Sequence, residues 1–353
     1  MKVDYLIIGQ GLAGSLLVHE LQKAGKSCFV LDDPKQIKAS EVAAGVVNPV
    51  VFRRLTKSWL IDELYPQLLE TYAELEKRFG VKLFYPLQIK KIFGKGEVEF
   101  WQKKWAENDL QTYLEAKPDK QKHPFIEADF GMGIVAQSGR IDLKQLVEKT
   151  RPHLKEKQLI RFEKFNFETL KLNKTQVCYQ DICAEKVLFC EGHAVSENPF
   201  FERLRFRHTK GEVLRIKTEN YDSNFILNKA MFLMPEGQQL YRLGATYDWD
   251  DHSLETTSQA RQELQEKLAA VFTDQYQVVD QQAGIRPTTH DRRPVIGLHP
   301  EHPQVGIFNG LGSKGAMLGP YFARQFAAFL CGKIKQLHPE VTISRYFNND
   351  KDS

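Results

Sequence analysis

The sequence of 353 residues lacks the features of a membrane, fibrous or disordered protein. No window approaches the roughly 20 consecutive apolar residues that a membrane-spanning helix needs. No internal repeat and no Pro- or Ser-rich linker divides the chain, and its 42% hydrophobic and 27% charged residues exclude a collagen-like or low-complexity protein. A chain of this length can bury a full core and favours two lobes, which without a linker are expected to be interleaved.

Cysteine is scarce and scattered. None of the five cysteines belongs to a Cys-x-x-Cys pair, and they are Cys28, Cys178, Cys183, Cys190 and Cys331. This spacing favours neither a metal site nor a disulfide framework, so we expect buried free thiols in a reducing compartment. Residues 1–5 lead straight into an apolar block without a cleavage signal, so the sequence predicts no signal peptide and a cytoplasmic protein.

A strong charge of one sign is also absent. The 49 Lys and Arg residues exceed the 45 Asp and Glu residues by only four, which is too mild to indicate a nucleic acid or an anionic membrane as partner. The ten histidines show no metal-ligand spacing, so no metal is predicted. The one basic cluster alternates as Arg203, Arg205 and Arg207, which would place three arginines on one face of a strand.

The first thirty residues have the pattern of a βαβ unit. Residues 3–8 are a short apolar run typical of a strand buried on both faces in a parallel sheet. A glycine-rich turn follows over 9–14, then a helical pattern over 15–24 that ends at Gly25. A second strand over 27–31 closes the unit.

This unit predicts dinucleotide binding. Gly9 permits a tight turn, Gly11 lets the backbone approach a pyrophosphate, and Gly14 lets the helix pack closely on the strand. Asp32 stands eighteen residues after Gly14, where an acid can bond ribose hydroxyls. An ordinary glycine-rich turn is the alternative interpretation.

The rest of the chain alternates between helical and strand patterns. Strands are expected at 81–93, 187–190, 204–216, 240–247 and 306–308. Helices are expected at 59–79 with an interruption near Pro66, at 98–114, at 142–149, at 258–272, and from the last glycine loop to about residue 330.

Three further segments carry recognisable motifs. Ser40-Glu41-Val42-Ala43-Ala44-Gly45 follows the second strand, Gly284-Ile285-Arg286-Pro287 lies late in the chain, and Asn309-Gly310-Leu311-Gly312-Ser313-Lys314-Gly315 precedes the last helix. Together with Lys210-Gly211-Glu212 and Gly244-Ala245-Thr246, these segments resemble the D-amino-acid-oxidase-like (DAO) family of FAD-dependent oxidoreductases, in particular its glycine oxidase branch.

The resemblance implies an α/β fold with two lobes. A Rossmann-type FAD-binding lobe with a parallel sheet, formed by 1–50, 140–200 and 280–345, would be interleaved with an antiparallel-sheet substrate lobe formed by 51–139 and 201–279. The residues that would hold FAD are Gly9, Gly11, Leu12, Ala13, Gly14, Asp32, Ser40, Ala43, Ala44, Gly45, Gly192, Gly310, Gly312, Ser313, Lys314 and Gly315.

The resemblance also implies a chemistry, which is oxidation of the C–N bond of a small-molecule amine or amino acid by hydride transfer to flavin N5. Arg286 would grip the substrate carboxylate, and Lys314 would be a second catalytic cation beside the flavin. Tyr241 and Tyr247 could enter the substrate pocket, but core packing is the favoured interpretation of each. Either an oxidase or a dehydrogenase fits this pattern.

Three positions depart from the family pattern. Phe232 and Ser313 stand where glycine oxidase has a carboxylate-binding tyrosine and a second arginine. Glu191 stands in Cys190-Glu191-Gly192 where relatives have alanine, and the sequence offers no reason for this acid.

Three other functions remain open. The same fold and a Gly-Ala-Thr-Tyr-like segment occur in the oxidase half of a tRNA wobble-uridine modification enzyme, so a flavin-dependent oxidase acting on a modified tRNA base ranks second. A nicotinamide-only dehydrogenase would leave 284–315 unexplained. A flavin-binding protein without amine oxidase activity would fit the three departures.

Overall fold

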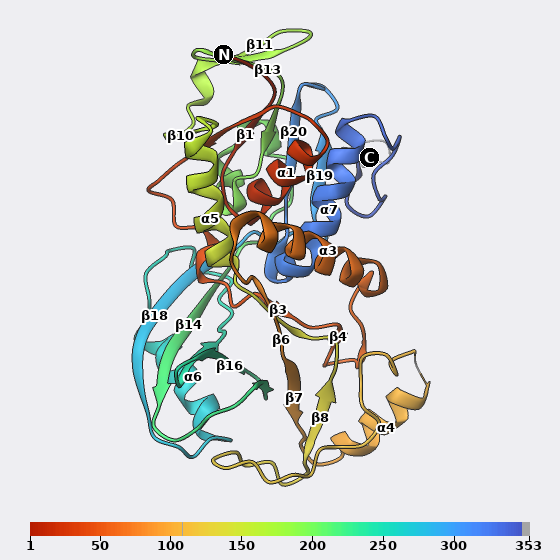
Figure 1. Cartoon of the computed structure of the whole chain (residues 1–353), viewed down its shortest axis with the longest axis vertical. Helices are drawn as coiled ribbons and strands as arrows, with labels where there is room; N and C mark the ends of the chain where they lie inside the picture. Colours follow the sequence, from red (N-terminus) through yellow and green to blue (C-terminus); the bar gives the residue numbers. More distant parts are fainter. Residues whose placement is uncertain (108, 348–353) are drawn as a thin grey trace.

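The computed structural model describes residues 1–107 and 109–347. Its secondary structure gathers into two large sheets, and Figure 1 shows the first in the upper part of the molecule and the second in the lower part. No helix in these two ranges is long and apolar enough to cross a membrane.

The first sheet is mainly parallel and has eight strands. Its central order is β10-β2-β1-β13, and β20 pairs with β13 on the free side of that strand. The strands that run parallel are β1 (Lys2–Ile8), β2 (Cys28–Asp32), β10 (Ile160–Phe162), β13 (Ile182–Phe189) and β20 (Val305–Asn309). Antiparallel pairs are added at the sides by β11 (Leu170–Leu172), β12 (Val177–Tyr179) and β19 (Val295–Leu298).

Helices cover this sheet because its strands are apolar on both faces. Leu6 and Ile7 are successive residues of β1 and point to opposite faces, yet both are completely buried. The helices of this layer are α1 (Leu12–Lys23), α3 (Ile61–Phe79), α5 (Leu143–Glu156) and α7 (Gly315–Leu330), and α1 and α3 both pack against α7.

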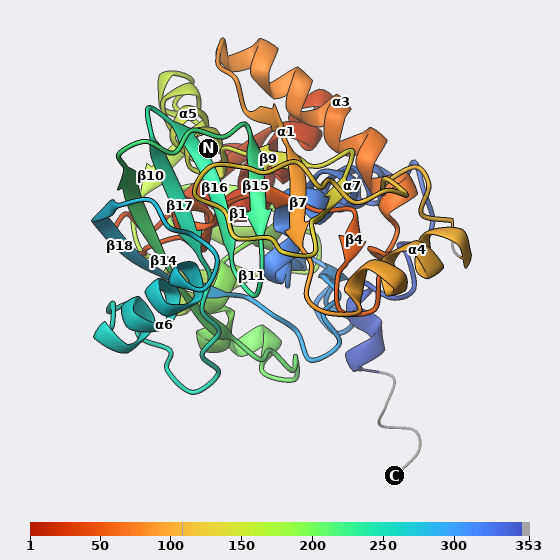
Figure 2. The same ribbon diagram turned by 90° about the horizontal axis from the view of Figure 1, so that it is seen from below.

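The second sheet has seven strands in the order β18-β14-β17-β16-β15-β7-β8. These are β7 (Gln88–Ile92), β8 (Met132–Val135), β14 (Thr209–Thr218), β15 (Phe225–Asn228), β16 (Phe232–Gly237), β17 (Leu240–Gly244) and β18 (Tyr276–Arg286). All neighbours are antiparallel except β15 and β7. Figure 2 shows this sheet in front of the first when the molecule is seen from below, with α6 (Ser258–Ala269) outside it.

Short elements complete the chain. They are α2 (Ala39–Val42), α4 (Glu97–Glu107), the three-stranded group β3 (Val46–Val47), β6 (Phe84–Pro86) and β9 (Gly139–Ile141), and the pair β4 (Val50–Val51) and β5 (Thr56–Lys57). Five 3-10 turns are η1 (Phe167–Thr169), η2 (Gly192–Glu197), η3 (Pro199–Phe201), η4 (Gly312–Lys314) and η5 (Ile343–Tyr346).

The predicted fold class is confirmed. The chain enters the second sheet at 88–135, returns to the first at 160–189, enters the second again at 209–286 and ends in the first. The two layers are therefore interleaved, as expected. The predicted residue boundaries of the two lobes stay a prediction.

The expectation that all five thiols are free is wrong. Cys178 on β12 and Cys183 on β13 are direct partners across an antiparallel pair, with Cα atoms 4.1 Å apart, and they form a disulfide. Facing positions of this kind bring two sulfur atoms within bonding reach, and the linear spacing of five residues does not reveal them. Cys28, Cys190 and Cys331 are free.

Two details of the predicted elements are also wrong. The helix α3 runs continuously from Ile61 to Phe79 and includes Pro66, although a proline cannot donate a backbone hydrogen bond there. Residues 203–207 precede β14 and form no strand, so the three arginines do not share a strand face. Arg203 lies over the ring of Phe347, and Arg207 lies over that of Trp249.

Gly14 tests the packing of α1 on the sheet. A Cβ at Gly14 would overlap the carbonyl oxygen of Gly9, whereas a Cβ at Gly11 would meet only Ser40 Oγ at 3.5 Å. We expect Gly14→Ala to lower the free energy of unfolding of the apoprotein by about 1–3 kcal/mol. Gly11→Ala should leave it nearly unchanged in the same urea titration. Equal stability of the two variants would contradict the packing described here.

Candidate functional site

A cavity of about 480 Å³ lies between the two sheets. The first sheet and its helices contribute the glycine turn at 9–13, Asp32, residues 190–193 and residues 311–317. The second sheet contributes positions on β14, β16, β17 and β18. The first glycine turn and the glycine loop after Asn309 therefore line one cavity.

Most of the residues predicted for the site line this cavity. They are Gly9, Gly11, Leu12, Ala13, Asp32, Ser40, Ala43, Ala44, Gly45, Gly192, Arg286, Gly312, Ser313, Lys314 and Gly315. Gly14 and Gly310 lie behind the lining, where Gly14 packs on Gly9 and a Cβ on Gly310 would come within 3.1 Å of Val295 N.

The glycine turn leaves its backbone open to the cavity. Gly9 has φ +98°, and a Cβ there would come within 2.6 Å of the carbonyl oxygen of Cys190. Helix α1 begins directly after Gly11 with no side chain capping its first turn. Its free N–H groups and partial positive charge therefore face the cavity, which suits an anionic group.

Asp32 ends β2 beside this turn and is only 2% exposed. Its Oδ1 accepts a hydrogen bond from Gln10 N at 2.8 Å. Its Oδ2 has no hydrogen-bond partner among the described residues, although Lys38 Nζ forms an ion pair with it at 3.1 Å. A buried carboxylate oxygen with spare acceptor capacity suits a ligand hydroxyl.

A polar network holds the turn in place from behind. The side chain of Gln10 is completely buried and donates to Ser15 Oγ at 2.9 Å and to Val147 O at 3.0 Å. Arg151 on α5 donates to Gln10 Oε1 and also pairs with Glu41 on α2. The turn is thus tied to two helices that the sequence patterns did not connect with it.

The late glycine loop reaches the same cavity from the other end of the chain. Asn309 donates from Nδ2 to Gly192 O at 2.8 Å and accepts Gly310 N at its Oδ1. Gly315 opens α7, and a Cβ there would lie 2.9 Å from a methyl group of Leu12 on α1. The first turns of α1 and α7 therefore meet side by side, and a Cβ at position 315 would require the Leu12 side chain to move.

Arg286 ends β18 and lies across β14. Its Nη1 donates to Lys210 O and its Nη2 donates to Thr246 O, both at 3.2 Å. The guanidinium occupies the space that a side chain at position 211 would fill, which explains Gly211. Tyr247 lies over the guanidinium at 4.3 Å. No carboxylate in the described ranges forms an ion pair with Arg286. Burial of the guanidinium lowers the pKa of this arginine.

Lys314 is a second cation of the cavity without a carboxylate partner among the described residues. It donates to Ser58 Oγ at 3.0 Å. Burial, together with nearby Arg293 and Arg292, lowers its pKa to about 8. Its charge is therefore easily lost or regained near neutral pH.

The three departures from the family pattern all line the cavity. Phe232 places an apolar ring there from β16, and Ser313 places a hydroxyl there from the late loop. Glu191 follows β13, and burial raises the pKa of its carboxyl to about 8.

Of the two tyrosines assigned to the core, only Tyr241 belongs to it. The Tyr241 ring is buried, and its hydroxyl accepts Ser223 N. Tyr247 is 61% exposed and lines the cavity, so that assignment is wrong. An alternating strand pattern predicts which face a residue takes, but β17 ends at Gly244, before Tyr247.

Sequence reasoning missed other lining residues. Gln36, Ile37 and Lys38 line the cavity between Asp32 and α2, and His193 lines it after Gly192. Lys38 and His193 are single polar residues in loops, and no local pattern distinguishes such residues from solvent-exposed ones.

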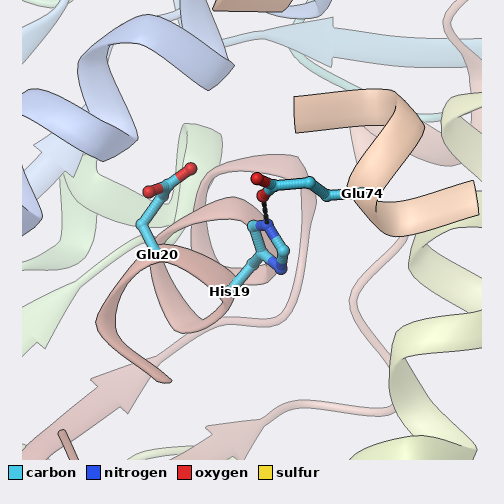
Figure 3. A group of neighbouring side chains, drawn as sticks. All are labelled: His19, Glu20 and Glu74. Atoms are coloured by element: carbon cyan, nitrogen blue, oxygen red, sulfur yellow. Dashed lines mark hydrogen bonds and ion pairs between the residues drawn. The ribbon is translucent and has the colours of Figure 1, made fainter. Parts of the chain in front are cut away.

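A separate cluster of possible metal ligands joins α1 to α3. His19 Nε2 lies 3.0 Å from Glu74 Oε2, and Figure 3 shows Glu20 beside this pair. Lys23 pairs with Glu74, and Arg324 lies 3.6 Å from Glu20. Because these cations already neutralise the carboxylates, we read the cluster as an ion-pair network between helices and assign no metal to it.

The chain was compared with known proteins. It is 23% identical to the tRNA 5-methylaminomethyl-2-thiouridine biosynthesis bifunctional protein MnmC of Idiomarina loihiensis, covering 97% of this chain but 59% of that protein. It is 22% identical to the uncharacterized oxidoreductase YurR of Bacillus subtilis, covering 95% of this chain and 96% of that protein.

Solved structures share the fold. Glycine oxidase from Geobacillus kaustophilus superposes with a TM-score of 0.80 at 17% identity, covering 95% of this chain and 96% of that one. L-alpha-glycerophosphate oxidase from Mycoplasma pneumoniae with FAD bound superposes with a TM-score of 0.71 at 15% identity, covering 94% and 95%. Residues 4–329 match the family model described as FAD dependent oxidoreductase, DAO. The chain therefore belongs to the DAO family of FAD-dependent oxidoreductases, and FAD is its cofactor.

Proposed function

We propose that this protein binds FAD in the cavity and oxidises the C–N bond of an amine that carries a carboxylate. The observation that carries the proposal is Arg286, a cation that lines the cavity and whose guanidinium has, among the described residues, only backbone carbonyls and a tyrosine ring as partners. A charged group desolvated in this way needs an anion, and a ligand carboxylate can supply one.

The residues around the cavity fit the cofactor. The open backbone of the glycine turn and the first turn of α1 would hold the diphosphate, and Asp32 Oδ2, which keeps acceptor capacity beside its ion pair with Lys38, would accept a ribose hydroxyl. The late loop would bring the first turn of α7 to the flavin. When bound, FAD supplies the acceptor for the hydride that leaves the substrate carbon.

Arg286 would orient the substrate. Two carbonyl oxygens hold the guanidinium from one side, so its remaining N–H groups can bind both oxygens of a carboxylate. This grip would fix the carbon beside the amine relative to the cofactor, and such positioning contributes much of the rate enhancement in reactions that need little acid–base chemistry.

Lys314 would add positive charge at the cavity. With a pKa of about 8 it is mostly protonated at pH 7, and it attracts an anionic substrate there. Above that pH it is neutral and can accept a proton from a substrate ammonium. Substrate amines must lose that proton before hydride can leave.

A modified tRNA base is the second candidate substrate. Tyr247 is an exposed aromatic ring at the cavity and offers a stacking surface for a base. The Idiomarina relative is named for a tRNA modification, but this chain covers only 59% of its length. The net charge of +4 supplies little general attraction for RNA, which keeps this candidate second.

Substrate panels separate the two candidates. We expect anaerobic bleaching of the flavin absorbance by one or more N-alkyl glycines or amino acids, and none by tRNA whose wobble uridine carries an aminoalkyl modification. Bleaching by that tRNA alone would favour the second candidate. No bleaching by either would contradict both and leave a flavin-binding protein.

Arg286→Leu tests the carboxylate grip. We expect the purified variant to keep its FAD and to lose about 100-fold or more in kcat/KM, because a desolvated charge pair contributes a few kcal/mol. Arg286→Lys should recover only part of the loss, since an ammonium cannot form the two-pronged bond. Unchanged kinetics in Arg286→Leu would discredit the role.

Asp32→Ala tests the ribose contact. We expect the Kd for FAD, measured by fluorescence on the apoprotein, to rise about tenfold or more, because a charged acceptor of a hydroxyl is lost. Asp33→Ala is the matched control, since Asp33 lies next in the chain but does not line the cavity. The assignment fails if both variants bind FAD as tightly as the wild type.

A further inference from the structure

Glu191 is an acidic residue close to the glycine turn that is proposed to hold the negatively charged diphosphate. It lines the cavity that we propose for FAD, and its Cα would lie 3.4 Å from a Cβ on Gly9. The same glycine turn is proposed to hold the diphosphate. An ionised carboxylate at this point would stand close to the negative charge of the cofactor.

No cation compensates this acid in the described part of the chain. Its Oε2 accepts one hydrogen bond, from the uncharged amide of Asn198 at 2.8 Å, and no Lys or Arg forms an ion pair with it. Asn198 is itself fixed, because its Oδ1 accepts Phe200 N and its side chain is buried. Glu191 therefore has a rigid neutral partner on one oxygen and none on the other.

The hydrogen bond from Asn198 favours the ionised form of Glu191, whereas burial and the neighbouring groups favour its neutral form. Burial is the main cause of its raised pKa of about 8, and nearby Glu197 adds to it. His193 has a pKa lowered by burial and is neutral above pH 7. Lys38 lines the same cavity, but it pairs with Asp32.

We propose that Glu191 serves as a protonated acid in the cofactor cavity, so that the apoprotein admits FAD only when this carboxyl carries its proton. Because Oε2 accepts the Asn198 amide, Oε1 is the oxygen that carries the proton. A neutral acid donates through that proton to a phosphate or hydroxyl oxygen of the ligand. This inference rests on the proposed position of FAD in the cavity.

The direction of the pH effect follows from the coupling between FAD binding and protonation of Glu191. Below pH 8 the apoprotein already carries the proton, and FAD binding is independent of pH. Above pH 8 the proton must be taken up on binding, so the Kd rises by up to tenfold per pH unit. An ordinary surface glutamate, ionised at every pH above 6, would produce no such change.

The test is titration of apoprotein with FAD between pH 6.5 and 9.0, followed by flavin fluorescence. We expect the wild-type Kd to rise about tenfold between pH 7 and pH 9, and Glu191→Gln, which keeps the shape and the neutral charge, to show a nearly flat profile. Calorimetry at pH 9 in two buffers of different ionisation enthalpy should detect uptake of close to one proton by the wild type and a much smaller uptake by Glu191→Gln.

Lys314 is the necessary comparison because its pKa is also about 8 and it lines the same cavity. Lys314→Met should keep most of the wild-type pH dependence of FAD binding. The inference is overturned if the wild-type Kd is constant over the range, or if Glu191→Gln keeps the dependence and Lys314→Met loses it. Failure of the wild type to bind FAD at pH 6.5 would instead contradict the proposed cofactor site, and this inference with it.

Discussion

The contact between the first turns of α1 and α7 is the constraint on which the cavity depends. Gly315 and Gly319 on α7 face Leu12 and Leu16 on α1 so closely that a Cβ at either glycine would lie within 3 Å of a leucine methyl group. This packing brings the start and the end of the chain together at the carboxyl edge of the first sheet. Two helix N-termini then face one space, and both favour an anionic ligand.

The second sheet encloses that space from the other side and contributes Arg286 to its lining. Its strands β14 and β18 are paired along their length, which places Arg286 opposite Thr209 and lets the guanidinium fold over Gly211. The cavity therefore has a cation held by neutral groups at the substrate side and a carboxyl held by a neutral amide near the glycine turn. Neither group has a charged partner among the described residues, so a ligand carboxylate would complement Arg286, whereas the carboxyl of Glu191 fits beside an anionic ligand only in its protonated form.

The fold alone leaves the reaction open. Proteins named for glycine oxidation and for glycerophosphate oxidation share this architecture with the chain at less than 20% identity. This protein departs from the family pattern at three residues of the cavity lining, which are Phe232, Ser313 and Glu191. The exposed ring of Tyr247 also lines the cavity. Function in such folds follows from the site, and at these positions the cavity of this protein has a character of its own.

Local periodicity in the sequence predicted the βαβ opening, and its glycines stand where a side chain is disfavoured, as at Gly9 with φ +98°. The interleaved lobes and most of the residues found in the cavity lining were predicted from the resemblance of scattered motifs to the DAO family. Only the tertiary structure decided that Cys178 faces Cys183, that Tyr247 lies over Arg286, and that Gln10 is held by Arg151. These contacts join residues through strand register or across elements distant in the chain, and local pattern carries no information about such distances. The raised pKa of Glu191 and the lowered pKa of Lys314 belong to the same class, because burial is a property of the assembled molecule.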